Sequence, residues 1–454
     1  MSKGYFLIAL GCDKNIIDAE VMAGRLKREG YCPVGDPAEA DIMIVHTCTF
    51  VEGATEESID TILELGSQKG YGKALVVSGC LAQRYPNELA KEIPEVDLIL
   101  GVGKHTELLE WLGRERIVVS SPEDWDINMM ESNTMERIPS TPRHYAFLKV
   151  SEGCNNRCSY CVIPLVRGGL RSRPVDDIVA EAGCLREGGI FELNLVAQDL
   201  ASYGLDLLNG NGLYGLPGLL RSLLDGTDIP WIRLLYLHPK NITSDLIDLV
   251  AREERIVSYM DVPVQHCSDT ILKSMGRGIE KKGILTLIDE IRSRIEKIYL
   301  RTSLIVGYPG EGEGEFKELY NFVRDVKFQN LGVFRYSREE GTRANNMIGH
   351  LPEDVIEERY RAIMELQRGI SLAENERLVG ERVVALIDGI SEKGEDESED
   401  PAVFRGRFYG QAPEVDGNIK IRGVGLSSGD VVDVLITGAG HYDLFGEVVK
   451  KIVE

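Results

Sequence analysis

The stretch Ser151-Glu-Gly-Cys154-Asn-Asn-Arg-Cys158-Ser-Tyr-Cys161 places three cysteines within eight residues, directly after an apolar segment of strand type. Thiolates are the protein ligands of iron–sulfur clusters, and a loop this tight lets them converge. An electron-carrying cluster of the ferredoxin type has four cysteine ligands, whereas this loop supplies three. One iron of a cluster held here keeps an open coordination position, which catalysis at the cluster requires. We therefore predict a catalytic [4Fe-4S] cluster on Cys154, Cys158 and Cys161.

A structural zinc site and unreactive buried thiols are the alternatives for this loop. Zinc sites with CxxC pairs usually contain two such pairs or closely spaced histidines, and the sequence has neither a second CxxC nor a His-x3-5-His pattern. Cysteines often pack in cores as small apolar residues, but this loop is polar and contains glycine and asparagine. Both alternatives are therefore weaker than the cluster.

Length, composition and charge indicate a globular protein of several domains. At 454 residues the chain can form two or three domains, and its 43% hydrophobic and 27% charged residues are ordinary for such proteins. The formal net charge of -22 argues against a general nucleic-acid binder, which needs clustered lysine and arginine. It favours a basic partner such as a basic protein, although surface acid can equally serve only solubility.

The cysteine content and the N-terminus indicate the cellular compartment. Nine cysteines in a chain of this length are too sparse and too unevenly spaced for a secreted disulfide framework. The apolar run at residues 5–10 is too short for a signal peptide, and no apolar run approaches membrane-spanning length. We expect a soluble cytoplasmic protein.

Residues 1–121 alternate short apolar runs with helix-compatible stretches. Buried-strand patterns occupy residues 5–10, 42–46 and 74–78, and stretches such as 18–29 and 55–65 have helical character. This alternation predicts an open parallel α/β sheet.

Three further cysteines follow these strands at equivalent places. Cys12, Cys48 and Cys80 each lie just beyond the C-terminal end of one strand, and such ends face one crevice in which ligands bind. We predict a second three-cysteine cluster here, with three unrelated buried thiols as the alternative. The remaining cysteines, which we interpret as structural, are Cys32, Cys184 and Cys267.

A polar linker with several prolines is expected at residues 122–143, and residues 144–376 then alternate strand and helix regularly. Six strand patterns predict a parallel (βα)6 barrel or most of one, whose active site lies at the C-terminal strand ends. The predicted strands are residues 145–150, 191–196, 231–237, 257–262, 298–306 and 331–336. The first cysteine loop directly follows the first of these strands.

Polar residues at the other strand ends are candidates for the same cavity. Any single one could instead cap the following helix. The candidates are Gln198, Asp199, His238, Gln265, His266, Arg301, Thr302 and Ser303. A turn at residues 307–311 follows the fifth strand, and its Gly307 would let the backbone approach a nucleotide-like ligand.

A helix predicted at residues 353–377 leads out of the barrel, and about five short β patterns follow in residues 377–454. They predict a small antiparallel barrel, a kind of module that often binds RNA. Residues 380–454 contain fifteen Asp or Glu against eight Lys or Arg, however, and this balance disfavours direct RNA binding. Docking to a basic protein fits better, and the acidic residues 395–400 are expected to form a solvated loop.

The CxxxCxxC pattern, with the aromatic Tyr160 before its last cysteine, resembles the signature of the radical S-adenosylmethionine (SAM) enzymes. In that family the open iron binds SAM, and the residue before the third cysteine lies beside the adenine. The resemblance therefore implies SAM as a cofactor. The candidate SAM contacts are Tyr160, Gln198, Gln265, Arg301, Ser303 and Gly307.

Over essentially its whole length, the chain resembles the methylthiotransferase family. The motifs that carry the resemblance are Gly11-Cys-Asp-Lys-Asn15, His46-Thr-Cys-Thr-Phe50, Ser78-Gly-Cys-Leu81, Leu170-Arg-Ser-Arg-Pro174, Val196-Ala-Gln-Asp199 and Asp261-Val-Pro-Val-Gln-His266. The resemblance implies a C-terminal TRAM domain. It also implies two [4Fe-4S] clusters, the auxiliary one on Cys12, Cys48 and Cys80.

Other motifs resemble the branch that methylthiolates an aspartate of small-subunit ribosomal protein twelve. They are Lys14-Asn15, Thr141-Pro-Arg-His-Tyr-Ala146, Gln411-Ala-Pro-Glu-Val-Asp-Gly417 and Tyr442-Asp-Leu-Phe-Gly446. Asp13 departs from that branch, where proline is common, and residues 313–315 are looser than the usual acidic turn. The implied partners are ribosomal protein twelve or the ribosome, and an electron donor such as a flavodoxin or ferredoxin.

The resemblance implies that SAM is cleaved reductively and that the resulting radical takes a hydrogen from the β-carbon of the target aspartate. Sulfur would come from the auxiliary cluster and the methyl group from a second SAM. Two alternatives stay open. A tRNA-modifying methylthiotransferase is disfavoured by the acidic small barrel, and a non-catalytic iron–sulfur protein on the ribosome is disfavoured by the three-ligand sets.

Overall fold

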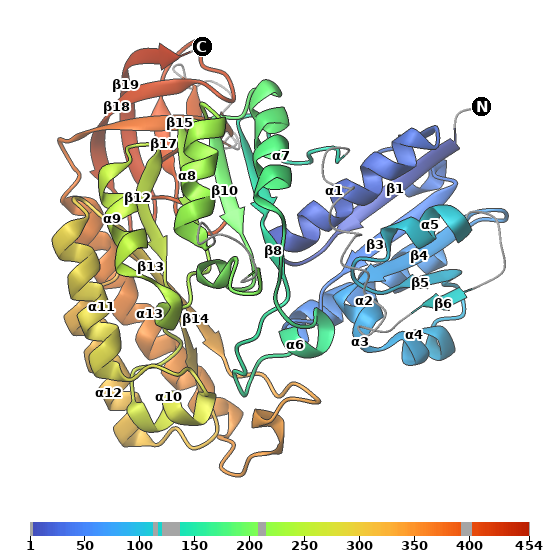
Figure 1. Cartoon of the computed structure of the whole chain (residues 1–454), viewed down its shortest axis with the longest axis horizontal. Helices are drawn as coiled ribbons and strands as arrows, with labels where there is room; N and C mark the ends of the chain where they lie inside the picture. Colours follow the sequence, from blue (N-terminus) through green and yellow to red (C-terminus); the bar gives the residue numbers. More distant parts are fainter. Residues whose placement is uncertain (1–2, 112–116, 120–136, 208–214, 392–401, 454) are drawn as a thin grey trace.

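The computed structural model describes residues 3–111, 117–119, 137–207, 215–391 and 402–453. Most of the expected linker, residues 122–136, and the acidic run at residues 395–400 lie outside the described residues. The described chain forms an N-terminal sheet, a central sheet and a C-terminal barrel, with the central sheet between the other two (Figure 1).

The N-terminal sheet is parallel throughout and has six strands in the order β2-β1-β3-β4-β5-β6. The three predicted strands are β1 (Lys3–Ala9), β3 (Ile42–Thr47) and β4 (Ala74–Gly79). The strands not predicted are β2 (Tyr31–Pro33), β5 (Leu98–Leu100) and β6 (Ile117–Val119). Three residues are too few to show a periodic pattern, which explains why the sequence did not reveal them.

Helices cover both faces of this sheet because its central strands are apolar on both sides. Met43 and Val45 of β3 pack on one face with α2 (Glu52–Ser67), whereas Ile42 and Ile44 pack on the other with α1 (Asp13–Arg28). The other helices of this unit are α3 (Cys80–Arg84), α4 (Pro86–Glu92) and α5 (His105–Trp111). This double cover keeps β3 and β4 central and fixes their C-terminal ends.

The central sheet is a partial barrel of six parallel strands in the order β14-β13-β12-β11-β10-β7. All six predicted strands are present: β7 (Tyr145–Lys149), β10 (Glu192–Val196), β11 (Trp231–Leu234), β12 (Ile256–Asp261), β13 (Tyr299–Val306) and β14 (Asn330–Arg335). The strands β7 and β14 are the two edges of this sheet, so it does not close.

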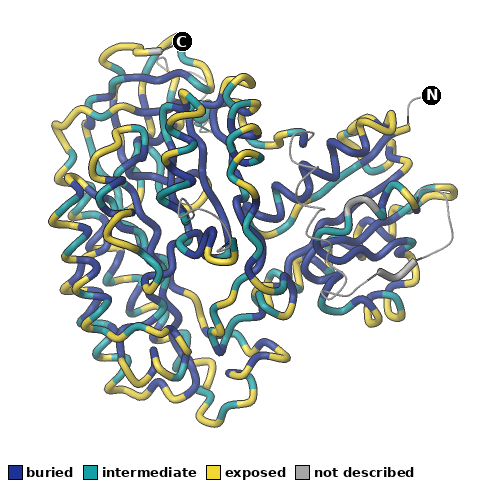
Figure 2. Tube along the Cα trace, in the orientation of Figure 1, coloured by how far each residue is buried: buried dark blue, intermediate teal, exposed yellow. Residues whose placement is uncertain are grey.

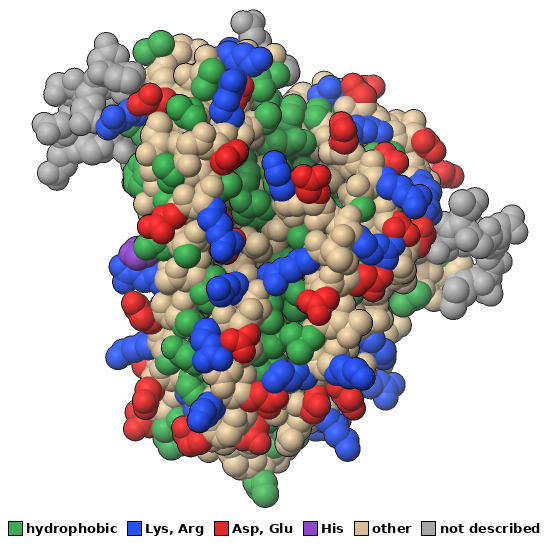
Figure 3. All heavy atoms as spheres, turned by 90° about the vertical axis from the view of Figure 1, so that its left-hand side faces the viewer, with side chains coloured by type: hydrophobic (Ala, Val, Ile, Leu, Met, Phe, Trp, Pro, Cys, Tyr) green, Lys and Arg blue, Asp and Glu red, His purple; other side chains and the backbone are tan. Residues whose placement is uncertain are grey.

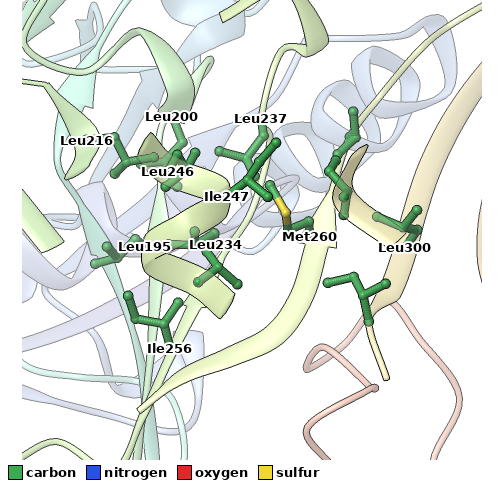
Figure 4. Packing of buried hydrophobic residues seen from close by; sticks show 14 of the residues in the cluster. Leu195, Leu200, Leu216, Leu234, Leu237, Leu246, Ile247, Ile256, Met260 and Leu300 are labelled. Carbon is green, nitrogen blue, oxygen red and sulfur yellow. The ribbon is translucent and has the colours of Figure 1, made fainter. Parts of the chain in front are cut away.

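Helices pack on the outer side of the central sheet. They are α7 (Val175–Glu187), α8 (Leu216–Gly226), α9 (Ser244–Arg252), α11 (Lys281–Arg294), α12 (Glu313–Val326) and α13 (Glu353–Glu376). Leu234 and Met260 of the sheet pack with Leu216 and Leu246 of the helices (Figure 4). Figure 2 shows the result, with buried strands inside and helices exposed on their outer sides.

The C-terminal unit is the predicted closed barrel of five strands. They are β15 (Arg382–Ile390), β16 (Val403–Phe408), β17 (Ile419–Arg422), β18 (Val431–Ala439) and β19 (Leu444–Val453). One pairing differs from the expected antiparallel pattern, because β17 and β19 run parallel. Phe404 and Phe408 fill the core of this barrel, whereas Tyr442 and Phe445 are exposed.

The C-terminal barrel binds the N-terminal ends of the central strands through buried ion pairs. Arg407 donates to Glu192 of β10 at 2.7 Å and to Asp388 at 2.8 Å, and Arg233 of β11 donates to the same Glu192 at 2.6 Å. The motif at residues 411–417 reaches into the partial barrel, where Asp416 accepts from Tyr259 at 2.7 Å. This motif therefore serves the contact between the two units.

We expect Arg407→Ala to lower the free energy of unfolding by about 3 kcal/mol, because it leaves the buried Glu192 with only one of its two cationic partners. Urea denaturation measures the change. Arg382→Ala is the matched control, since it removes a barrel arginine whose ion pair with Asp433 lies at the surface and should change stability little. An equal loss for both variants would contradict this account of the interface.

One face of the molecule carries charges of both signs. Figure 3 shows acidic and basic side chains interspersed over the face on the left of Figure 1. No helix among the described residues combines the length and the apolar character that crossing a bilayer requires.

Candidate functional site

The loop with Cys154, Cys158 and Cys161 leaves β7 and β8 (Ser151–Glu152) at the C-terminal end of the central sheet. Gly153 starts it with φ +75°, and a Cβ on this residue would lie 2.0 Å from the carbonyl oxygen of Gly169. The Cys154 amide then donates to the Gly168 carbonyl at 3.1 Å. Glycine is required here because the returning chain lies directly on the loop.

Gly153→Ala should therefore displace the cysteine loop. If each cysteine set holds a cluster, the variant should retain about half of the iron of the unaltered chain after reconstitution. Gly183→Ala is the control, since Gly183 lies within α7 and a Cβ there meets no atom within 4 Å. Full iron content in the Gly153 variant would refute the steric argument.

Two of the three thiols of this loop are costly to ionise in the absence of a bound cation. Burial raises the pKa of Cys154 to about 11, and burial together with the neighbouring Cys158 raises that of Cys161 to about 12. Iron compensates such charge, and the three soft donors therefore fit a cluster. Among the described residues, no three His, Cys, Asp or Glu side chains surround a single point as ligands of one metal ion. A cluster differs because each thiolate binds a different iron.

Cys12, Cys48 and Cys80 also lie together, at the C-terminal ends of β1, β3 and β4. A Cβ on Gly11, which has φ +90°, would lie 2.7 Å from the Cys48 sulfur. Burial raises the pKa of Cys80 to about 12, and Cys12 and Cys48 act in the same direction. The structure thus brings the three cysteines of this predicted set close together.

The two cysteine sets are close neighbours. Cys80 packs in one buried cluster with Val162, which follows Cys161, and with Val166 of α6 (Ile163–Val166). Arg167 comes next and reaches back to the N-terminal unit, where its guanidinium donates to Asn15 at 2.5 Å. Sequence reasoning did not find Arg167, because nothing in its local pattern distinguishes a buried arginine from a surface one.

Polar strand-end residues hold the first loop in place. Asp199 accepts hydrogen bonds from Asn156 of the loop at 2.7 Å and from Asn241 at 2.9 Å. Arg277 was not predicted, and it donates to the Cys158 sulfur and to the Tyr160 hydroxyl, both at 3.4 Å. Asp199 therefore orients the loop, and Arg277 places a positive charge beside one of its sulfurs.

Several buried polar atoms around this loop have no hydrogen-bond partner among the described residues. They are Ser151 Oγ, Gln198 Oε1 and His238 Nε2, at the ends of three neighbouring strands. His238 Nδ1 accepts from the Lys240 amide, and burial lowers the pKa of the ring to about 2, so Nε2 carries a proton and is a donor. Buried polar atoms are rarely left unpaired, and this set fits a polar ligand such as SAM.

The predicted SAM contacts have different surroundings. Tyr160 packs with Tyr308 and Met275. Gln198 donates to Glu152 at 2.5 Å. Gln265 has φ +70°, and its amide donates to the Ser303 carbonyl at 2.8 Å, so these two residues are adjacent.

Two of the predicted contacts are engaged elsewhere in the protein. Arg301 forms an ion pair with Asp416 of the C-terminal barrel at 2.6 Å. Gly307 has φ +81°, and a Cβ there would lie 2.5 Å from Ile356 of α13, so a close approach to this helix already accounts for the glycine. Of the other strand-end candidates, His266 lies 3.4 Å from Glu311, and the Thr302 hydroxyl donates to the Val262 carbonyl.

Comparison with known proteins gives three family matches along the chain. Residues 4–101 match an uncharacterized protein family, UPF0004, residues 148–323 match the radical SAM superfamily, and residues 379–449 match the TRAM domain. Both cysteine sets fall within the first two matches.

The chain is also similar to curated proteins over nearly its full length. It is 43% identical over 450 residues to ribosomal protein uS12 methylthiotransferase RimO of Geobacter sulfurreducens, covering 98% of each chain. It is 44% identical over 446 residues to the protein of that name from Geotalea uraniireducens, again covering 98% of each.

Among solved structures, the radical SAM methyltransferase TsrM of Kitasatospora setae, with cobalamin and a [4Fe-4S] cluster bound, superposes with a TM-score of 0.56. The identity is 15%, and the match covers 87% of this chain and 78% of the other. At this identity the likeness shows a shared fold.

Proposed function

This chain belongs to the RimO family of ribosomal protein uS12 methylthiotransferases, and we propose that it adds a methylthio group to the β-carbon of an aspartate of uS12. It is a radical-SAM enzyme. The observation that carries the proposal is that two three-cysteine sets lie close together, each at the C-terminal ends of parallel strands. Val162 and Val166 pack against Cys80, and Arg167 bonds to Asn15.

We assign one [4Fe-4S] cluster to Cys154, Cys158 and Cys161 and the auxiliary cluster to Cys12, Cys48 and Cys80. When bound, the two clusters and SAM supply the electron, the radical chemistry, the sulfur atom and the methyl group. The chain's own residues bind and orient these groups. Ser151, Gln198 and His238 offer polar atoms to SAM, and Asp199 holds the cysteine loop through Asn156.

The domain limits follow from this assignment. We propose a methylthiotransferase α/β domain at residues 1–121, a linker at 122–143, a radical-SAM barrel at 144–376 and a TRAM domain at 377–454. Since its substrate would be a ribosomal protein, we also propose that the enzyme acts in the cytoplasm and receives electrons from a flavodoxin or ferredoxin.

The charge of the chain favours the protein substrate over tRNA. The net charge of -22 suits a basic ribosomal protein and repels an RNA backbone.

Substrate choice is tested by anaerobic reconstitution, followed by incubation with SAM, a reductant and either uS12 or tRNA. Mass spectrometry of both products should detect one methylthio group on an aspartate of uS12 and none on tRNA. The Cys154→Ala chain is the control for chemistry that does not need the enzyme. Modification of tRNA alone would overturn the proposed substrate.

A further inference from the structure

One guanidinium links the two cysteine sets. Arg167 has 2% of its side chain exposed, and its Nη2 donates to Asn15 Oδ1 at 2.5 Å. Its Nη1 donates to both oxygens of Glu152, at 2.9 and 3.0 Å, and to Asp18 Oδ2 at 3.2 Å. The two nitrogens therefore face different partners, the carboxylates on one side and the auxiliary cysteine set on the other.

Asn15 connects Arg167 to all three segments that carry the auxiliary cysteines. It lies three residues after Cys12, and its Nδ2 donates to the Leu10 carbonyl at 2.7 Å and to the Thr47 carbonyl at 3.0 Å. Its Oδ1, which accepts from Arg167, also lies 3.8 Å from the Cys80 sulfur. Arg167 therefore reaches the Cys80 side of this set through Asn15.

The other side of Arg167 belongs to the radical-SAM loop. Glu152 lies two residues before Cys154, and it also accepts from Lys149 at 2.8 Å and from Gln198 at 2.5 Å. Two cations, Arg167 and Lys149, and two anions, Glu152 and Asp18, thus form one buried network. The network is neutral in sum, and the Nη2 group of Arg167 bonds outside it to Asn15, whose Oδ1 lies 3.8 Å from the Cys80 sulfur.

We propose that Arg167 is a positioning residue for the auxiliary cluster. Its positive charge on the Cys80 side raises the reduction potential of that cluster, and its hydrogen bonds fix the cluster relative to the radical-SAM loop. This inference rests on the proposed function, which places a cluster on each set. Its physical basis is that a cation and N–H donors near cluster sulfurs stabilise the more negative, reduced state. The carboxylates of Glu152 and Asp18 hold the guanidinium in place.

The test uses the full-length chain in which Cys154, Cys158 and Cys161 are all replaced by alanine, so that only the auxiliary set can bind a cluster. A redox titration followed by electron paramagnetic resonance gives its midpoint potential. Adding Arg167→Gln should disfavour reduction about tenfold, which is about 59 mV toward more negative values for a one-electron couple. Arg167→Lys keeps the positive charge but loses the planar guanidinium with its two donor groups. It should shift the potential in the same direction as Arg167→Gln, but by less.

Glu152→Gln should shift the potential of the auxiliary cluster in the opposite direction. It removes a negative charge while Arg167 stays, so the potential of the auxiliary cluster should become less negative. Arg359→Gln is the matched control, because Arg359 is a buried arginine paired with Glu311 at 2.7 Å in another part of the protein. It should leave the potential unchanged.

The outcomes separate this inference from the proposed function. If the parent chain without the radical-SAM cysteines binds no iron and sulfide, the auxiliary cluster itself is refuted. If it binds a cluster whose potential is the same with Arg167→Gln, the role of Arg167 is refuted and the cluster assignment stands. If the Arg167→Gln chain fails to bind iron, the Arg167→Lys and Glu152→Gln variants test the inference instead. An unchanged potential in both of them overturns it.

Discussion

Cys154→Ala is expected to abolish the release of 5′-deoxyadenosine from SAM, reducing it to the level of a reaction without enzyme. Cys154 is one of only three thiols in the loop, so its removal leaves too few ligands for a cluster that can bind SAM. The measurement is chromatographic quantification of 5′-deoxyadenosine under anaerobic conditions with a strong reductant.

The control for this variant is Cys184→Ala. Cys184 is exposed on α7 and belongs to neither set, so this substitution should leave the release rate unchanged. Normal release from the Cys154 variant would sink the radical-SAM assignment of this loop.

Cys12→Ala should have a different effect, preserving SAM cleavage while stopping the formation of methylthiolated uS12. Its thiol belongs to the set assigned to sulfur donation, and the radical-SAM loop keeps all three of its cysteines. The substitution is mild for the fold, because Cys12 precedes α1 without capping it through its side chain. Product mass spectrometry and 5′-deoxyadenosine assays on the same samples measure both effects.

Cys32→Ala is the matched control, since Cys32 is the exposed cysteine of the same N-terminal unit. It should retain both activities. Methylthiolation by the Cys12 variant at the unaltered rate would remove the sulfur-donor role from this set.

The sequence was most informative where a pattern is local. Alternating apolar runs identified every strand of the central sheet to within a few residues, and the closed C-terminal barrel followed from five short β patterns. The two cysteine sets that we assign to clusters were also visible in the sequence. Cys12, Cys48 and Cys80 each follow the end of a strand, and the other three share one loop. In each case a few consecutive residues contain the signal.

What the sequence did not reveal depends on contacts between distant segments. The Arg167–Asn15 hydrogen bond joins residues 152 positions apart, and the Arg407–Glu192 pair joins residues 215 positions apart. Both arginines look like surface residues in sequence. The sequence predicts structural roles for Cys32, Cys184 and Cys267, but of these three only Cys267 is buried, whereas Cys32 and Cys184 are exposed.

Arg301 shows how a correct position can leave a role open. It stands on a predicted strand of the central sheet, and sequence reasoning made it a SAM contact. In the structure its guanidinium pairs with Asp416, which comes from a loop more than a hundred residues further along the chain. Arg301 therefore helps to hold the C-terminal barrel, a role separate from the predicted cofactor contact. The sequence does not show this role, because only the fold brings Asp416 to this strand.

The account depends on two separate clusters, and the most direct test is the iron and sulfide content of three anaerobically reconstituted chains. The unaltered protein should bind about eight irons, and chains lacking either Cys154, Cys158 and Cys161 or Cys12, Cys48 and Cys80 should each bind about four. Mössbauer spectra should show a [4Fe-4S] cluster in each. If removing either cysteine set eliminates all iron, or leaves the iron content unchanged, the two-cluster account is wrong.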